Sequence, residues 1–223
     1  MKEILKTLCL IAIFTYSQIS LCLETDVSTQ IGWDHLKQEW PSDLTSPLTG
    51  QAQNLLWLGG GLTILVVATQ NSVAHPLQES WSERKPLGSL SRFGDLSGQM
   101  LPNIFYLIGF GAHYYQTDSL DSHRRAWLMT KASAYSGLAT TVLKYSIREP
   151  RPDNGNERNA FPSGHSTSAF AFASVVASEH EWYYGVASYA LATFVAASRI
   201  NDNRHWLQDV VAGATIGASY GIG

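Results

Sequence analysis

Six apolar stretches constrain the fold of this chain more than any other feature of its sequence. They are rich in Ala, Leu, Gly and Ser, and they lack the alternation of apolar and polar residues that is typical of strands. Ala and Leu favour helices, so each stretch predicts a helix. The stretches cover approximately residues 54–70, 101–116, 126–146, 166–180, 182–198 and 206–222. The sequence therefore predicts an all-α fold, a helical bundle of about six core helices.

Prolines at the borders of these stretches support the helical interpretation. Pro102 stands where a first helical turn tolerates proline, and Pro150 with Pro152 ends the third stretch. Pro162 precedes the fourth stretch, with Ser163 as a candidate helix cap. The segment 75–98 is polar and contains Pro and Gly, so we expect a long surface connection with at most a short helix.

The N-terminus has the pattern of an export signal. Lys2 and Lys6 precede a short apolar run, and small and polar residues follow up to Cys22. We expect residues 1–22 to be a signal peptide or a retained N-terminal anchor, and residues 23–53 a polar arm. Residues 54–223 then form the main domain. This organisation predicts export to the periplasm or to the outer side of the cytoplasmic membrane.

Charge and cysteine content exclude several classes of function. The formal net charge of -3 lacks the basic footprint of a nucleic-acid-binding protein, so we expect no nucleic-acid partner. Both cysteines, Cys9 and Cys22, lie in the predicted signal segment. Its removal would leave no thiol nucleophile, no disulfide and no cysteine ligand for a metal.

Two stretches keep a membrane interpretation open, because residues 54–74 and 96–117 contain no charged side chain. Their uninterrupted apolar cores are nevertheless shorter than the roughly 20 residues needed to span a bilayer. If every stretch spanned, an exported N-terminus would also place the segment 144–165 in the cytoplasm. We therefore expect a compact helical domain outside the cytoplasm, with contact to a membrane surface as one alternative.

Three short segments carry residues suited to phosphate chemistry. Lys144 and Arg151 offer a point charge and a planar fork of donors for phosphate oxygens, although both also suit a solvated helix end. Ser163 and Gly164 precede a helix, where backbone N–H groups bind anions, but a simple helix cap has the same sequence. His165 stands beside them as a candidate proton donor.

The third segment contains Arg199, His205 and Asp209. The spacing of four residues between His205 and Asp209 places them on one face if both are helical. The carboxylate can then accept a proton from one ring nitrogen and leave the other free as a nucleophile. A buried His–Asp pair with a purely structural role has the same spacing.

Together the three segments resemble the signature of the type 2 phosphatidic acid phosphatase (PAP2) superfamily. The matching parts are Lys144 with Arg151-Pro152, then Pro162-Ser163-Gly164-His165, then Ser198-Arg199 with His205 and Asp209. The superfamily includes bacterial class A acid phosphatases, lipid phosphatases and vanadium haloperoxidases. All three parts are present in the order that the family has, without a departure at a defining position.

The resemblance implies a metal-independent phosphatase without a cofactor, which hydrolyses phosphomonoesters through a phosphohistidine intermediate. It implies that His205 attacks phosphorus, that Asp209 orients it, and that His165 protonates the leaving group. Phosphate binding falls to the remaining residues of the signature, which are Lys144, Arg151, Ser163, Gly164 and Arg199.

The resemblance leaves the substrate open between a lipid phosphate or diphosphate and a soluble ester. A vanadium-dependent haloperoxidase and an inactive envelope scaffold are the alternative functions. The chain is short for the haloperoxidase branch, and a scaffold has no need of both histidines and the aspartate. The sequence carries no signal for an oligomeric state.

Overall fold

The computed structural model describes residues 33–153 and 156–223, so the predicted signal segment and the first part of the arm lie outside the described residues. Every regular element in the described ranges is a helix, which confirms the predicted all-α fold. The longer helices are α2 (Trp33–Thr45), α3 (Gly50–Ala68), α4 (His75–Arg84), α5 (Ser91–Gly98), α6 (Leu101–Thr117), α7 (Leu120–Ile147), α8 (Gly164–Glu179), α9 (Trp182–Asn201) and α10 (Leu207–Ile222). The short helical turns are η2 (Ser46–Leu48), η3 (Gln70–Ala74) and η4 (Gly88–Leu90).

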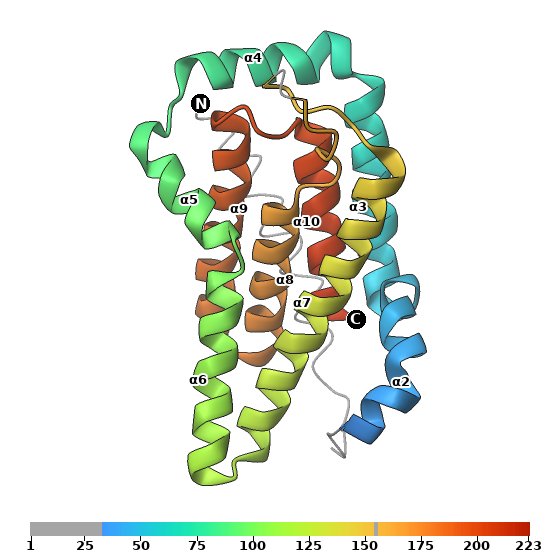
Figure 1. The fold of residues 1–223 in the computed structure, drawn as a ribbon, viewed down its shortest axis with the longest axis vertical. Coiled ribbons are helices and arrows are strands. Elements are labelled where there is room, and N and C mark those ends of the chain that lie inside the picture. The colour runs from blue at the N-terminus through green and yellow to red at the C-terminus, as the bar shows by residue number, and fades with distance from the viewer. Residues whose placement is uncertain (1–32, 154–155) are drawn as a thin grey trace.

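Helix α8 is the centre of the bundle, and it packs against α7, α9 and α10 (Figure 1). Helix α8 fits between its neighbours because helices with Ala and Ser on their contact faces can approach one another closely. The buried residues of α8 and α9 that form one apolar cluster are Ala169, Ala173, Ala177, Tyr189, Ala192 and Val195. A second cluster joins Met129 and Ala132 of α7 to Val175.

Two glycines of α10 bring this helix into direct contact with the backbone of α8. A Cβ atom at Gly217 would overlap the carbonyl oxygen of Thr167, and one at Gly213 would overlap that of Ser163. Only glycine permits an approach this close. The start of α10 therefore lies against the start of α8, where the second and third segments of the signature are located.

The stretches predicted at 54–70 and 126–146 both begin earlier in the structure, as α3 and α7. Helix α7 starts at Leu120 because Ser119 caps it, accepting a hydrogen bond from the backbone N–H of Ser122 at 3.4 Å. Helix α3 starts at Gly50, within the segment expected to be a polar arm, and packs against α10. The arm also contains α2, so its described part is largely helical.

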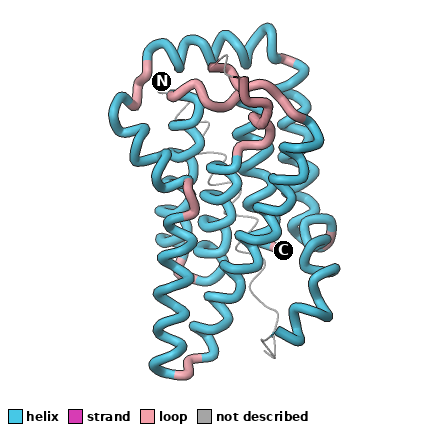
Figure 2. Tube along the Cα trace, viewed as in Figure 1, coloured by secondary structure: helices cyan, strands magenta, loops and turns pink. Residues whose placement is uncertain are grey.

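The segment 75–98 differs most from the expectation of a surface connection, because α4 and α5 occupy most of it. Helix α5 packs against α9 through a face of small residues, Ser91, Gly94, Ser97 and Gly98. Serine and glycine carry no apolar signal, so a search for apolar periodicity does not detect such a face. This contact brings α5 beside the end of the bundle formed by the starts of α8 and α10, where loops gather (Figure 2).

Candidate active site

The three segments of the signature meet at one end of the bundle. Helix α7 ends there, α8 begins there, and the turn between α9 and α10 lies beside them (Figure 1). Backbone hydrogen bonds join the segments: the N–H of Ser163 donates to the carbonyl of Asp209 at 2.9 Å, and that of Ala160 donates to Glu149 at 3.0 Å. Residues far apart in sequence are thereby fixed relative to one another.

Lys144 and Arg151 both contact Asn159, which lies in the loop before α8. The Lys144 ammonium donates to the Asn159 carbonyl at 2.5 Å, and Arg151 Nε donates to the Asn159 side-chain oxygen at 2.9 Å. Burial and, to a smaller extent, the neighbouring Arg151 charge lower the pKa of Lys144 to about 8. The two cations are therefore held close together, and the Glu157 carboxylate lies 3.0 Å from Arg151 Nε. Two adjacent cations favour a bound anion.

Ser163 caps α8, as predicted for a simple helix cap. Its Oγ accepts hydrogen bonds from the backbone N–H of Ser166 at 3.4 Å and from the Ser166 hydroxyl at 3.1 Å. Gly164 opens the helix, and a Cβ atom there would lie 3.9 Å from Lys144 Cε. The positive end of the α8 dipole therefore lies beside the Lys144 side chain.

His205 and Asp209 form a buried pair at the start of α10. His205 Nδ1 lies 3.3 Å from Asp209 Oδ2, and the same oxygen accepts the backbone N–H of Trp206 at 2.8 Å. The spacing predicts that both residues share one face if both are helical, but α10 begins at Leu207, so His205 precedes it. The Asp209 carboxylate caps the helix at Trp206, and this contact holds the histidine and the carboxylate together across the helix start.

The surroundings of His205 favour a neutral imidazole. Burial lowers its pKa well below the ordinary value, and the positive charges of Lys144, Arg151 and Arg199 act in the same direction. With its Nδ1 proton donated to Asp209, the lone pair lies on Nε2. Burial has the opposite effect on Asp209 and raises the pKa of its carboxyl to about 7.

Asp95 of α5 is a member of this site that the sequence argument missed. Its Oδ1 accepts a hydrogen bond from the Arg199 guanidinium and lies 3.1 Å from His165 Nε2. Arg199 is almost fully buried and also contacts Asp202 at 3.1 Å. Asp95 thus lies between two residues of the signature, although it comes from a helix that was expected to be a surface connection.

Glu149 is a second member that the sequence argument did not single out. It accepts a hydrogen bond from the Gln208 side chain at 2.9 Å, next to Asp209 in the chain. Burial and, to a smaller extent, the negative charge of Asp209 raise the pKa of the Glu149 carboxyl to about 7. A protonated Glu149 beside an ionised Asp209 is therefore favoured over two adjacent carboxylates.

Arg199 Nε is a buried donor that lacks a hydrogen-bond partner within the described residues, and His165 Nε2 has there only its 3.1 Å contact with Asp95. Buried polar atoms in native proteins are nearly always hydrogen-bonded, so Arg199 Nε is a donor available to an acceptor oxygen of a ligand. Across residues 33–153 and 156–223, no group of three His, Cys, Asp or Glu residues has an arrangement that could hold a metal ion.

Comparisons with known proteins identify relatives of this chain. Residues 125–223 match the family described as the PAP2 superfamily. A lipid A 1-phosphatase of Porphyromonas gingivalis is 44% identical over 91 residues, which cover 40% of this chain and 20% of that protein. One from Rhizobium johnstonii is 29% identical over 160 residues, covering 62% of this chain and 65% of that protein. The chain thus spans a fifth of the first relative and about two thirds of the second.

A solved structure gives an independent comparison of the fold. The crystal structure of Aquifex aeolicus LpxE aligns with a TM-score of 0.50 at 20% identity, covering 68% of this chain and 93% of that one. At this identity the likeness concerns the helical fold. The match to the PAP2 superfamily, over residues 125–223, includes every residue of the three-part signature.

Proposed function

We propose that this protein is a metal-independent phosphatase that hydrolyses phosphomonoesters through a phosphohistidine intermediate. The observation that carries the proposal is the convergence of a neutral, carboxylate-bound His205 with the cations Lys144, Arg151 and Arg199. A neutral imidazole is a nucleophile, and cations placed around it stabilise the charge that develops on the phosphoryl oxygens.

In the first step, the lone pair of His205 Nε2 attacks phosphorus, and the bond from phosphorus to the ester oxygen breaks. His165 gives its proton to the departing alkoxide, so that a neutral alcohol leaves. In the second step, water transfers a proton to His165 and attacks the phosphohistidine, which releases inorganic phosphate and restores His205. Lys144, Arg151, Arg199, Ser163 and Gly164 hold the phosphoryl oxygens throughout.

The proposed substrate is a phosphate ester of a lipid, and two observations support this class. Curated relatives carry the name lipid A 1-phosphatase. In addition, α3 is the one described helix that is long and apolar enough to cross a membrane, and only 17% of its apolar window is buried. Trp57 and Ile64 are 70% and 71% exposed on it. Exposed apolar surface of this kind marks a contact with lipid or a partner.

We further propose that residues 54–223 act as the phosphatase domain, on the outer side of the cytoplasmic membrane. Helix α3 would contact the lipid in which the substrate resides. The site at the end of the bundle would then meet the phosphorylated end of the lipid.

A test of the function measures phosphate release by the full chain from a lipid phosphate and from a soluble phosphomonoester, each with and without EDTA. We expect release with both, a preference for the lipid, and no effect of the chelator. Separation of expressed cells into soluble and membrane fractions should recover the activity with the membranes. Loss of release on chelation would contradict the proposed chemistry, while activity confined to the soluble fraction would contradict the proposed lipid contact alone.

The variant Asp95→Asn is expected to narrow the pH range of activity. Burial lowers the pKa of His165 to about 4, Arg199 contributes to this, and the negative charge of Asp95 opposes it. His165 must be protonated to act as an acid, so activity falls as pH rises through its pKa. Loss of the Asp95 charge lowers that pKa, and the alkaline limb of the profile of kcat/KM should move to lower pH.

The same variant should bind inorganic phosphate more tightly, because the carboxylate of Asp95 competes with phosphate for Arg199 and His165. Product inhibition measured at a fixed acidic pH reports this effect. A purely structural role of Asp95 would lower kcat at all pH values without moving the limb, and that result would contradict the prediction.

A further inference from the structure

One oxygen of the Asp209 carboxylate takes no part in holding His205. Oδ2 lies 3.3 Å from His205 Nδ1 and accepts the backbone N–H of Trp206 at 2.8 Å. Oδ1 is buried, and within the described residues no N–H or hydroxyl group donates to it. An unpaired carboxylate oxygen inside a protein costs free energy, so this atom requires a proton donor from its surroundings.

The Glu149 carboxyl group is the side chain that can supply this donor, because it lies within hydrogen-bonding distance of the Asp209 carboxyl. Glu149 Oε1 also accepts a hydrogen bond from Gln208 Nε2 at 2.9 Å, and Gln208 is buried. Two ionised carboxylates contain acceptors alone, so they cannot bond to each other. One shared proton turns the contact into an O–H···O hydrogen bond and removes the repulsion between two like charges.

The hydrogen bonds around the two carboxyl groups indicate which of them keeps the proton. Asp209 Oδ2 is in contact with two N–H groups, and donors of this kind stabilise the anionic form. Glu149 receives the Gln208 amide alone, and its pKa is raised to about 7, mainly by burial. The positive charge of His75, at the start of α4, opposes this rise in the pKa of Glu149. The proton therefore belongs to Glu149 and the negative charge to Asp209.

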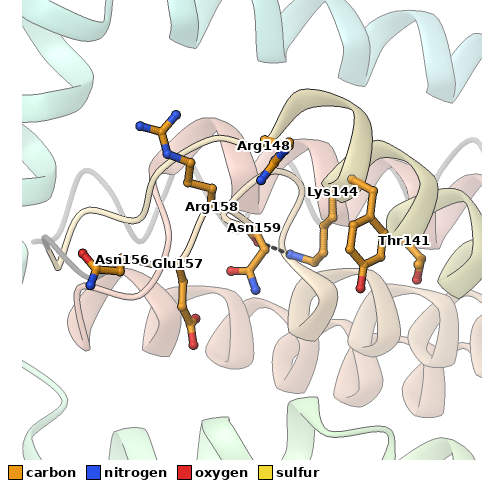
Figure 3. A pocket seen from close by; sticks show the side chains of 8 residues that line it. Thr141, Lys144, Arg148, Asn156, Glu157, Arg158 and Asn159 are labelled. Atoms are coloured by element: carbon orange, nitrogen blue, oxygen red, sulfur yellow. Dashed lines mark hydrogen bonds between the residues drawn. The ribbon is translucent and has the colours of Figure 1, made fainter.

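The backbone around Glu149 is fastened to the loop before α8 and to the turn before α10. The Ala160 N–H donates to the Glu149 carbonyl at 3.0 Å, and Trp206 Nε1 donates to the Pro150 carbonyl at 3.0 Å. Lys144 holds the same loop one residue earlier, where its ammonium group meets the backbone (Figure 3). The Glu149 side chain therefore has a fixed place relative to the start of α10.

We propose that Glu149 is a positioning residue for the nucleophile, which keeps a proton and donates it in a hydrogen bond to Asp209 Oδ1. The inference rests on the proposed phosphatase activity and adds a residue to its machinery. The bond fixes the plane of the Asp209 carboxylate, so that Oδ2 stays directed at His205 Nδ1 and Nε2 at phosphorus. Because Glu149 acts through Asp209 and not on the phosphoryl group, it affects the rate of attack and not the binding of phosphate.

The first experiment measures phosphohistidine formation by the full chain, as the single-turnover release of p-nitrophenol from p-nitrophenyl phosphate. Methionine has the length of glutamate without a donor, so Glu149→Met should slow the release about tenfold, the effect of roughly one hydrogen bond. The substrate concentration that gives half the maximal rate should not change. Glutamine offers a donor to Asp209 and an acceptor to Gln208, as a protonated glutamate does. Glu149→Gln should therefore recover most of the rate.

The pH profile of the same reaction distinguishes a proton donor from a purely structural residue. As pH rises through the pKa of Glu149, about 7, the wild-type protein loses the donated proton and gains a charge that repels Asp209. Its rate should fall about tenfold over this range, as in Glu149→Met. Glu149→Gln cannot ionise and should show no such fall. The limb from Lys144, whose pKa is about 8, should be present in both proteins.

Infrared spectra in D₂O at about pH 6 test the proton itself, without reference to activity. At this pH ordinary carboxyl groups are ionised. The wild-type protein should therefore show the C=O band of one carboxylic acid, and Glu149→Gln should lack it. Glu83→Gln, which removes an exposed carboxylate from α4, is the matched control and should keep the band.

Three results would overturn the proposal. They are a wild-type protein without the carboxylic acid band, a Glu149→Gln variant as slow as Glu149→Met, and equal rates in all three proteins. The band remains measurable if Glu149→Met fails to fold. Failure of the wild-type protein to form a phosphohistidine would instead overturn the proposed function, and the band would still report on the pair of carboxyl groups.

Discussion

The variant His205→Ala is expected to release phosphate at least about 10⁴-fold more slowly than the wild-type protein, because removal of a nucleophile that acts through a covalent intermediate eliminates the catalysed route. His205 is 3% exposed, and its Nδ1 lies 3.3 Å from Asp209. No other imidazole is held in this way by a carboxylate at the site, since His165 contacts Asp95 through Nε2. The measurement is phosphate release under single-turnover conditions.

Trapping of the intermediate gives a second measurement of the same role. Wild-type protein that is denatured in alkali during turnover should carry phosphate that is stable to base and released by acid, as expected of a phosphoramidate. His205→Ala should carry none. Phosphate found on another residue of the variant, or full activity without His205, would contradict the assignment.

The variant Asp209→Asn provides the matched control, because it keeps the size of the side chain and the bond from the Trp206 amide. It should lose less activity than His205→Ala and still form the intermediate. Asp209 is completely buried, and its carboxylate orients the ring rather than attacking phosphorus. A loss equal to that of His205→Ala, with no trapped intermediate, would indicate that orientation is indispensable to attack.

The apolar stretches predicted most of the bundle because burial and helix propensity act on the same residues there. Helices α6 and α9 begin at Leu101 and Trp182, where the sequence argument expected them. Helix α5 escaped detection because its buried face consists of Ser91, Gly94, Ser97 and Gly98. Such a face packs by close approach and not by apolar bulk, so it is recognised only when its partner, α9, is known.

The site residues that belong to the three-part signature could be predicted, because their order and spacing along the chain form a recognisable pattern. Asp95 lies on α5, outside that pattern, and reaches Arg199 only because α5 packs against α9. Glu149 stands next to Pro150 within the first segment, yet its contact with Gln208 depends on the packing of α10. Both are acidic residues whose proximity to the site depends on tertiary contacts, which no spacing in the sequence encodes.

The variant His165→Ala is expected to lose more activity on substrates with a poor leaving group than on substrates with a good one. An alkyl phosphate needs a proton on its departing oxygen, and loss of the acid should slow its hydrolysis by about 10²- to 10⁴-fold. The leaving group of p-nitrophenyl phosphate departs without protonation, so formation of the intermediate from it should be little affected. Release of p-nitrophenol and of alcohol in the pre-steady state measures the two cases.

The second step separates an acid role of His165 from a role in binding. His165 must accept a proton from the attacking water, so the variant should form the phosphohistidine from p-nitrophenyl phosphate and then hydrolyse it slowly. The result is a burst of p-nitrophenol equal to the concentration of sites, followed by a slow phase. A residue that only bound phosphate would raise KM for both substrates without a burst.

Because Arg199 and Asp95 contact the same edge of the site, Arg199→Lys serves as the binding control. Arg199→Lys should raise KM, and its loss of activity should be the same for substrates with good and poor leaving groups. Such a result would assign the proton transfer to His165 and not to Arg199.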